Sequence, residues 1–600
     1  MKNFVDRFPD WLRKRFTDGQ RFLILCIAAG VLCGLAAVAF HLSIHYTFDM
    51  VWEWARHQGK WFWFVMPLAP AVGGLIVGII LAKLAPNAAG SGIPQTKAAF
   101  YNDFGVIKFR EGVYRFVLGT IFIGFGNCLG REGPTVHMCA AIASKLGQLF
   151  GLAKARIQAM VPIGMGAGIA AAFNAPLSAI TFVFEELLDD FSTKALGGLV
   201  VAVVIAAAIS RIILGEDPVL TIHIGDDITT APWMLVSIPL GLASAFIGHV
   251  FVVILLRARA KSKAFKGVPV WLKPAAGGLA VGVIATIAFA LTSLLGEAQN
   301  GVFSIGYNSL LVAFEGQLVL GVLLILFVFK FAATLISYST GGSGGLFSPT
   351  LFLGGMLGGI FGVAMVWTHE NFGGFILEEP NQVVGGCVLL GMGALFASIV
   401  RCPFTSLLII FEMTRNYSLI LPLMAGNMIS YFVSAQLLKV PLYNSLLLQD
   451  GINLRKLPAY QGLQDYRNLP VSTIMTYDVI TVDGTLSSAA VLERIIDGKQ
   501  HHGYPVTDAE GALYGMVMHH ELEEFREAGN EDSLITILAH QKVISTNPDM
   551  SIRAAANLLI REDVLQIPVV SPKDEKKLLG ILTLHDIARQ QNAANEQMGR

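Results

Sequence analysis

Charged side chains are scarce in this sequence, and neither sign of charge is in excess. Only 14% of the 600 residues are charged, with 43 acidic and 43 basic side chains, whereas 54% are hydrophobic. Soluble globular chains carry about 25% charged residues, so most of this chain is expected to lie in lipid. The balanced charge offers no basic surface to a nucleic acid and no acidic tail to a cationic partner, so neither partner is expected.

The cysteines lack the spacing of a disulfide framework or a metal centre. All 6 stand singly within apolar stretches, without a C-x-x-C motif or an accompanying histidine. Structural zinc sites and disulfide scaffolds need clustered ligands, so no metal is expected and the cysteines are interpreted as small core residues.

A convincing cleavage site for a signal peptide is also missing. The first apolar run, from Phe22 to Phe40, follows a basic segment between Arg7 and Arg21. This pattern predicts an uncleaved first span, and the basic residues predict a cytoplasmic N-terminus by the positive-inside rule. We therefore expect a multi-pass protein of the cell membrane, with its N-terminus and C-terminal tail in the cytoplasm.

Apolar segments continue to about Leu448, but several are too short to cross a bilayer as one helix. The runs at 116–129 and 404–411 fall below the roughly 20 residues that a crossing needs. Turns rich in Gly and Pro interrupt the apolar segments at residues 90–94, 130–134 and 341–349. Interrupted backbone is tolerated at membrane depth only where it lines a protein cavity, which predicts broken helices around a buried site.

The membrane part also repeats itself. Residues 163–186 align with 390–413 with eight identities, which include a shared proline and a shared glutamate. A weaker match sets 130–135 against 345–350. Duplication with interrupted helices is typical of secondary transporters that bind substrate between their halves. We therefore predict an all-α membrane domain of two inverted halves.

The duplication singles out two acids without an acidic partner. Glu132 aligns with Phe347 and Glu186 with a methionine, whereas Glu185 is matched by Glu412. An ionisable group at membrane depth is costly and functional by default, so Glu132 and Glu186 are the candidate proton-handling acids, and Glu185 the candidate scaffold acid. The alternatives are an ion pair with the preceding arginine for Glu132 and a solvated surface position for Glu186.

The three Gly-rich turns precede buried helices, each with a proline where a first turn tolerates it. Unpaired amides at a helix N-terminus and the positive end of its dipole bind anions without a full positive charge. The alternative is that these glycines only allow close helix packing in lipid. Three such turns in one chain, two of them related by the repeat, favour the anion site.

These turns, in this order, and the segment Pro441-Leu442-Tyr443 resemble the signature segments of the CLC family of chloride channels and chloride/proton exchangers. The resemblance runs nearly end to end and implies a homodimer with one pore in each subunit. It also implies that Glu132 is the gating glutamate and that Glu186 is the internal proton glutamate, which exchangers carry and channels generally lack. The chloride-binding positions that it implies are Ser91, Ile93, Leu346, Phe347 and Tyr443.

We therefore predict chloride transport, with chloride/proton antiport ahead of a passive channel gated by Glu132, and no enzymatic activity. A remote alternative is an intramembrane serine protease, because Gly341-Gly342-Ser343-Gly344 fits a G-x-S-G motif. The histidine between that motif and the soluble tail is His369, in a polar loop, which argues against catalysis. Lys330, within an apolar run, is interpreted as a snorkelling or interface residue rather than a substrate ligand.

After Asp450 the sequence becomes polar and predicts a soluble α/β tail. Residues 474–525 and 543–589 share a Pro-Val strand followed by a Gly-led strand, and they resemble a tandem pair of CBS domains. The expected domains are a transport domain at 1–450, a linker at 451–468, and CBS domains at 469–528 and 529–600.

CBS domains in pairs can bind adenine nucleotides. The second repeat matches the family pattern G-x-x-T-x-x-D, which implies a nucleotide site with Thr583 at the phosphate and Asp586 at the ribose. The first repeat departs from the pattern, with Met518 and Glu521 at the corresponding positions. One adenine-nucleotide site is therefore expected, and a purely structural pairing module is the alternative.

Overall fold

The structure is a computed structural model that describes residues 17–188, 196–215, 230–373, 380–414, 417–454, 469–496, 501–530, 533–540 and 543–597. These residues belong to two compact units, Met1–Arg455 and Lys456–Arg600. The basic residues before Thr17, on which the predicted orientation depends, lie outside the described residues, as does most of the predicted linker.

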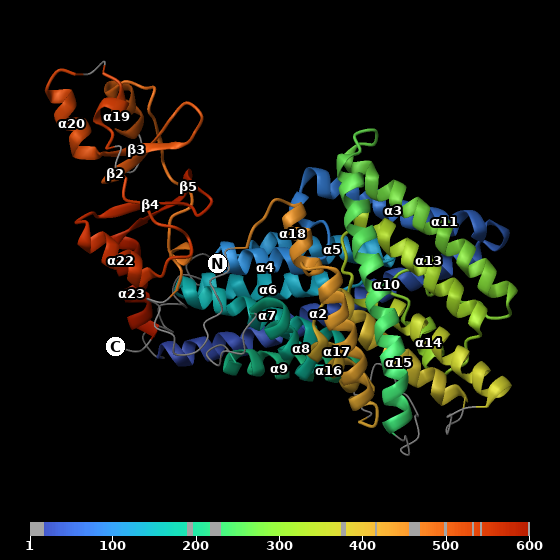
Figure 1. Ribbon diagram of the computed structural model, residues 1–600. Coiled ribbons are helices and arrows are strands. Elements are labelled where there is room, and N and C mark those ends of the chain that lie inside the picture. The colour runs from blue at the N-terminus through green and yellow to red at the C-terminus, as the bar shows by residue number, and fades with distance from the viewer. Residues whose placement is uncertain are drawn as a thin grey trace. The chain divides into compact units, whose positions relative to one another are not determined.

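The first unit is helical (Figure 1). Its first half contains α2 (Asp18–His57), α3 (Phe62–Lys83), α4 (Ile93–Asn102), α5 (Phe109–Gly124), α6 (Glu132–Leu149), α7 (Lys154–Phe173), α8 (Pro176–Phe182), the π-helical segment η3 (Val183–Leu188) and α9 (Leu196–Leu214). Its second half contains α10 (Thr230–Ala264), α11 (Lys273–Leu294), α12 (Tyr307–Phe314), α13 (Leu320–Ser339), α14 (Phe347–Phe372), α15 (Pro380–Ile399), α16 (Pro403–Thr414), α17 (Ile420–Leu437) and α18 (Leu442–Gln449).

Among the described residues, ten helical segments are long and apolar enough to cross a membrane. Others are too short for a crossing, such as α4 and α8 with 10 and 7 residues. This mixture of long and interrupted helices, followed by a tail of strands and helices, confirms the predicted fold class.

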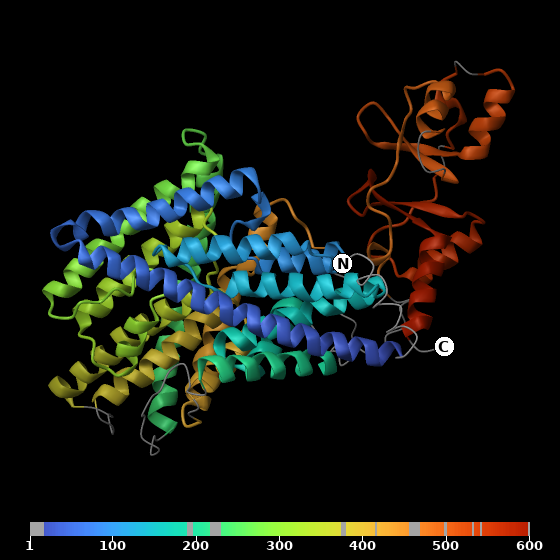
Figure 2. The same cartoon turned by 180° about the vertical axis from the view of Figure 1, so that it is seen from behind.

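Glycines allow the helices of this unit to pack so closely that their backbones are in contact. α14 and α15 lie side by side (Figures 1 and 2), and a Cβ atom at Gly358 would lie 1.9 Å from the Cys387 carbonyl oxygen. Across the same interface, a Cβ atom at Gly391 would lie 2.3 Å from the Gly354 carbonyl oxygen. Such contacts stabilise helix pairs in lipid, so part of the glycine content serves packing alone.

The two halves meet at their Gly-rich turns. Gly130 N donates to Gly345 O at 2.7 Å and Gly345 N donates to Gly130 O at 2.6 Å, so two residues that align in the repeat bond each other reciprocally. The turn before α4 joins them, because Gly90 N donates to Gly342 O at 2.9 Å. Arg115, fully buried on α5, fixes that turn by donating to Gly90 O at 3.1 Å.

Two matched acids cap short helices of opposite halves. Glu185, in η3, accepts hydrogen bonds from the Phe404 and Thr405 amides of α16 at 3.0 and 2.7 Å. Its repeat partner Glu412, on α16, accepts from two first-turn amides of α8 at 2.9 and 2.8 Å. Carboxylates stabilise helix N-termini in this way, so the geometry supports a scaffold role for Glu185.

The second unit contains two small sheets with helices beside them (Figure 1). The first group comprises β1 (Val482–Asp483), α19 (Ser488–Ile496), β2 (Gly503–Thr507), β3 (Leu513–Met518), α20 (His519–Glu527) and α21 (Ile535–Leu538). The second comprises α22 (Ile552–Arg561), β4 (Gln566–Ser571), β5 (Asp574–Thr583) and α23 (Leu584–Gln597).

The two sheets repeat one pairing. β2 and β3 are antiparallel with Val506 opposite Gly515, and β4 and β5 are antiparallel with Val569 opposite Gly580. Each sheet has its own hydrophobic core, and each core includes a short segment from the sequence of the other repeat. Residues 471–475 pack with the second sheet, and residues 535–539 pack with the first sheet.

Candidate functional site

The residues predicted to bind chloride lie at the N-termini of three helices, and the predicted gate lies at the N-terminus of a fourth. Ser91 lies two residues before α4, Ile93 begins α4, Leu346 precedes α14, Phe347 begins α14, and Tyr443 lies in the first turn of α18. All five are at most 1% exposed. Glu132, the predicted gate, begins α6 and is equally buried.

Three of these N-termini are in direct contact. A Cβ atom at Gly133 would lie 2.4 Å from Ser91 Oγ, which brings the start of α6 against the turn before α4. A Cβ atom at Gly345 would lie 2.8 Å from Gly133 N, which brings the turn before α14 to the same place. Tyr443 lies close enough to Glu132 and Glu186 for its hydroxyl to interact electrostatically with both carboxyl groups. The fold therefore gathers these residues from segments far apart in the sequence.

Two hydroxyl groups at this place have no hydrogen-bond partner among the described residues. Ser91 Oγ and Tyr443 OH are buried, and neither makes a hydrogen bond within the part of the chain that the structure describes. A buried hydroxyl without a partner costs about 1–3 kcal/mol, so such groups are expected where a ligand supplies the acceptor. Hydroxyl donors beside helix N-termini fit an anion.

Glu132 itself occupies the N-terminus of α14. Its Oε2 accepts a hydrogen bond from the Ser348 amide at 3.3 Å, and its Oε1 accepts from Tyr307 OH at 3.3 Å and from Ser348 Oγ. A Cβ atom at Gly130 would lie 2.4 Å from Oε2, so the carboxylate lies back over its own turn. Arg131 Nε is 3.8 Å from Oε1, which is an ion pair without a hydrogen bond. The carboxylate thus sits where an anion would be held.

The repeat partner of Glu132 has a different environment. The Phe347 ring packs against three aromatic rings, with centroids at 4.8 Å for Phe173, 5.7 Å for Phe182 and 4.3 Å for Phe396. Corresponding positions of the two halves therefore carry a polar, hydrogen-bonded acid and a ring in an apolar cluster.

Glu186 is a buried acid paired with a lysine that sequence reasoning missed. Lys97 Nζ lies 2.8 Å from Glu186 Oε1, and both side chains are about 95% buried. Cys402 Sγ lies 3.9 Å from the other carboxylate oxygen. Lys97 is on α4, one turn after Ile93, so this short helix joins the anion-binding turn to Glu186. A lysine on the buried face of α4 was the signal that could have found it.

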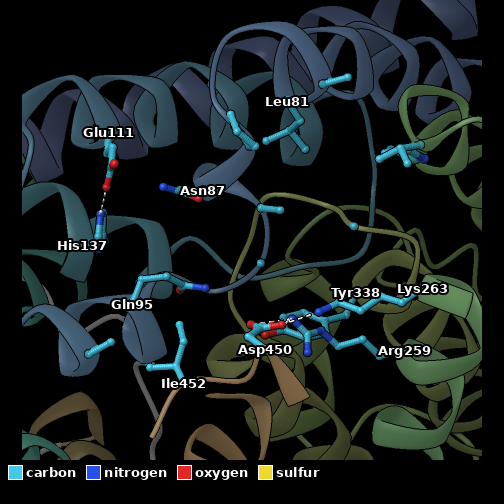
Figure 3. Close-up of a pocket in the computed structure, with 18 of the residues that line it drawn as sticks. Leu81, Asn87, Gln95, Glu111, His137, Arg259, Lys263, Tyr338, Asp450 and Ile452 are labelled. Carbon is cyan, nitrogen blue, oxygen red and sulfur yellow. Dashed lines mark hydrogen bonds and ion pairs between the residues drawn. The ribbon is translucent and has the colours of Figure 1, made fainter. Parts of the chain in front are cut away.

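A cavity of about 1150 Å³ borders the turn before α4. Its walls include Gly90 and Gln95 from this region and Tyr338 from the end of α13. Figure 3 shows Arg259 and Lys263 converging on Asp450, with Arg259 Nη2 at 2.8 Å from the carboxylate. The lining also includes Lys108 and Lys273 and the acids Asp103 and Glu111, so basic and acidic side chains nearly balance.

The protease alternative does not fit the structure. Ser343 is fully buried and its hydroxyl donates to the Ala88 carbonyl at 3.2 Å, which fixes the turn. His369 lies in the last turn of α14, about 30 Å along that helix from its start. A nucleophile and its base must be within hydrogen-bond reach.

The interpretation of Lys330 as a snorkelling residue is wrong. Its ammonium is fully buried and donates to the carbonyls of Gly301, Ser304 and Ile305 at 2.8, 2.9 and 3.0 Å. Three carbonyl acceptors satisfy the three donors of a lysine, so this cation holds the loop before α12.

In the second unit, Thr583 and Asp586 are adjacent in space. Asp586 Oδ2 accepts from Thr583 N at 3.0 Å and from Thr583 Oγ1 at 2.7 Å, at the start of α23. At the equivalent place in the first repeat, Glu521 accepts from the Met518 amide and from His540. Burial alone would raise the pKa of Glu521, but these hydrogen bonds outweigh it and hold that pKa below its usual range.

Comparison with known proteins gives matches over both units. A family model described as voltage gated chloride channel matches residues 73–435, and a CBS domain model matches 471–526 and 536–592. The H(+)/Cl(−) exchange transporter ClcA of Salmonella paratyphi B is 30% identical over 449 residues, which cover 73% of this chain and 90% of that protein. ClcA of Salmonella typhi is 30% identical over 447 residues with the same coverage.

Solved structures share the fold. A slow cyanobacterial Cl−/H+ antiporter has a TM-score of 0.62 and 25% identity, and the match covers 72% of this chain and 98% of that chain. A eukaryotic CLC transporter has a TM-score of 0.61 and 18% identity, and the match covers 94% of this chain and 98% of that chain. At 18% identity the second match supports the fold alone.

Proposed function

Because this chain belongs to the voltage-gated chloride channel (CLC) family, we propose that it transports chloride across a membrane in exchange for protons. Relatives at 30% identity are named H(+)/Cl(−) exchange transporters. The observation that carries the proposal is a pair of buried acids, Glu132 held at the N-terminus of α14 and Glu186 in η3, paired with Lys97.

Chloride is held between the helix N-termini. The unpartnered hydroxyls of Ser91 and Tyr443 are its side-chain donors. The amides at Ile93, Leu346 and Phe347 complete the cage. Neutral donors hold an anion firmly enough to select it and loosely enough to release it, which transport requires.

Glu132 is the gate. Its carboxylate takes the place of an anion at the start of α14, so an ionised Glu132 and a chloride ion compete for the same donors. Protonation removes its charge and weakens these hydrogen bonds, so the side chain leaves and the anion enters. Each opening of the anion path therefore takes up a proton.

Glu186 passes protons between the cytoplasm and Glu132. It is too deeply buried to be a solvated surface acid, and its partner Lys97 places a second ionisable group beside it. An ionisable group buried at membrane depth is costly and marks a proton relay more often than a scaffold. The other half of the repeat has no acid at the equivalent position. The proton path is therefore asymmetric, which is required if protons enter it from one side.

Purified full-length protein in liposomes tests the proposal, with chloride and proton fluxes recorded together. A chloride gradient is expected to drive protons uphill. Chloride flux without uphill proton movement would contradict antiport and would leave a passive channel.

Two variants separate the acids. Glu132→Ala is expected to keep chloride moving while it abolishes proton coupling and pH dependence. Glu186→Ala is expected to abolish coupling but leave chloride flux sensitive to external pH, because Glu132 remains. Glu315→Ala changes an exposed acid at the end of α12 and is the control that should match the parent. Uphill proton transport by Glu186→Ala at the parent rate would overturn the inner half of the mechanism.

We also propose the assembly and orientation that the family implies. The protein is a homodimer with one pore in each subunit, and its N-terminus and CBS pair face the cytoplasm. Light scattering of the purified protein is expected to give the mass of two chains. Protease added to sealed inside-out vesicles, whose cytoplasmic face is outside, is expected to remove the tail.

A further inference from the structure

We propose that the hydroxyl groups of Tyr307 and Ser348 form a clamp on the Glu132 carboxylate and set the external pH at which this gate opens. The proposal rests on the proposed role of Glu132 as the gate. It assigns a positioning role to two residues outside the predicted chloride cage.

The clamp is a cluster of polar contacts around the carboxylate, in which two hydroxyl protons and one amide proton are available as donors. Tyr307 OH lies 3.3 Å from Glu132 Oε1 and 3.0 Å from Ser348 Oγ. Ser348 Oγ bonds the same Oε1, and the Ser348 amide lies 3.3 Å from Oε2. Each hydroxyl has one proton to donate, and the carboxylate has acceptor sites for both. Both oxygens of Glu132 are therefore engaged in the closed position.

These donors favour the ionised acid. Hydrogen bonds to a charged acceptor are roughly twice as strong as neutral ones, so the clamp binds a carboxylate more tightly than a carboxylic acid. The groups recorded as facing Glu132 in the described residues are Arg131 on its own helix, Tyr307 on α12, the Ser348 amide and hydroxyl on α14, and Tyr443 on α18. Arg131 Nε is 3.8 Å from Glu132 Oε1, too far for a hydrogen bond, so the direct contacts recorded for the acid are the two hydroxyls and the Ser348 amide.

The loop before α12 places Tyr307. Tyr307 begins α12, two residues after Ile305, whose carbonyl binds the buried ammonium of Lys330 together with the carbonyls of Gly301 and Ser304. Ser304 and Gly306 have positive φ angles of 49° and 89°, so the loop makes a tight turn just before the tyrosine. The Tyr307 ring also lies 5.8 Å from the Arg131 guanidinium carbon. The hydroxyl is thus presented by a fixed loop.

Tyr307→Phe and Ser348→Ala remove one donor each with little change in shape. The full-length protein in liposomes is assayed for chloride flux as a function of external pH. Loss of a donor makes the ionised acid less stable in the closed position, so a lower external proton concentration is enough to release it. The pH of half-maximal flux is expected to rise by about one unit in each variant and further in the double variant.

Three comparisons separate the clamp from a general effect on packing. Ser348→Thr keeps a hydroxyl and is expected to restore the parent profile. In a Glu132→Gln background, neither variant should change the pH profile, because the titrating group is gone. The proposal is wrong if both single variants and the double variant keep the parent midpoint, or if the shift persists in Glu132→Gln.

The same data distinguish failure of the clamp from failure of the proposed antiport. If chloride flux proves uncoupled from protons but the midpoint still rises in Tyr307→Phe and Ser348→Ala, the clamp proposal holds and Glu132 is the gate of a channel. If coupling is present and the midpoint does not move, the antiport stands and the clamp is overturned.

Discussion

Lys97 and Glu186 form a buried ion pair whose presence in the membrane domain requires a functional explanation. Their ion pair of 2.8 Å is about 95% buried on both sides. The cost of removing two ions from water often exceeds their attraction, so such a pair is a poor source of stability compared with apolar packing. A proton path supplies the reason, because a lysine beside an acid stabilises its ionised form between transfers.

We therefore predict that Lys97→Met slows proton coupling while chloride still moves. Lys97→Met removes the charge partner of the buried Glu186 carboxylate while keeping a side chain of similar length. Uphill proton transport in liposomes is expected to fall at least tenfold. Tyr101→Phe is the matched control, since it removes a different contact of α4: Tyr101 lies one turn further along that helix and donates to Leu187 O at 2.6 Å. Parent-like coupling in Lys97→Met would show that the pair is only structural.

At the scale of elements, the interrupted helices need caps that membrane lipid cannot provide. α8 and α16 begin inside the protein, and their first amides would remain unpaired without Glu412 and Glu185. Each acid takes several hydrogen bonds from the opposite half, including one from a hydroxyl of the helix that it caps. The inverted duplication thus supplies each half with the cap that the other half needs.

Glu185→Gln and Glu412→Gln are expected to destabilise the protein equally, by about 1–3 kcal/mol each, because each replaces charged caps by weaker amide contacts. Thermal unfolding of the detergent-purified protein measures the loss. The ratio of chloride to protons should match that of the parent in both variants. A large loss in one variant with none in the other would show that the caps are not equivalent.

The repeat determined how much of the site could be predicted. Aligning one half with the other exposes Glu132 and Glu186 as acids without a counterpart, and this comparison needs no knowledge of their neighbours. Tyr307 could not be found in this way. It lies 175 positions from Glu132 in a stretch outside the aligned repeats, and its contact depends on how Lys330 folds a loop.

At the scale of the whole chain, transport and the tail are separate units, Met1–Arg455 and Lys456–Arg600. The tail is itself a repeat, and its two halves differ at the proposed nucleotide position. Glu521 already accepts a hydrogen bond from His540 at 2.7 Å, which occupies the carboxylate that would meet a ribose. Asp586 bonds only locally to Thr583 among the contacts recorded within the described residues, and a ligand can displace that contact.

We predict one adenine-nucleotide site per chain, at the second repeat. Asp586→Ala is expected to weaken binding of ATP, ADP or AMP about tenfold or more, because a charged acceptor contributes about 1–3 kcal/mol to each hydrogen bond with the ribose hydroxyls. Calorimetry on the full-length protein in detergent measures the affinity and the number of sites. Glu521→Ala, at the corresponding position of the first repeat, is the matched control and should bind as the parent does. Absence of nucleotide binding by the parent would leave the CBS pair a structural module, whereas two equal sites would show that the departure at Met518 and Glu521 does not prevent binding.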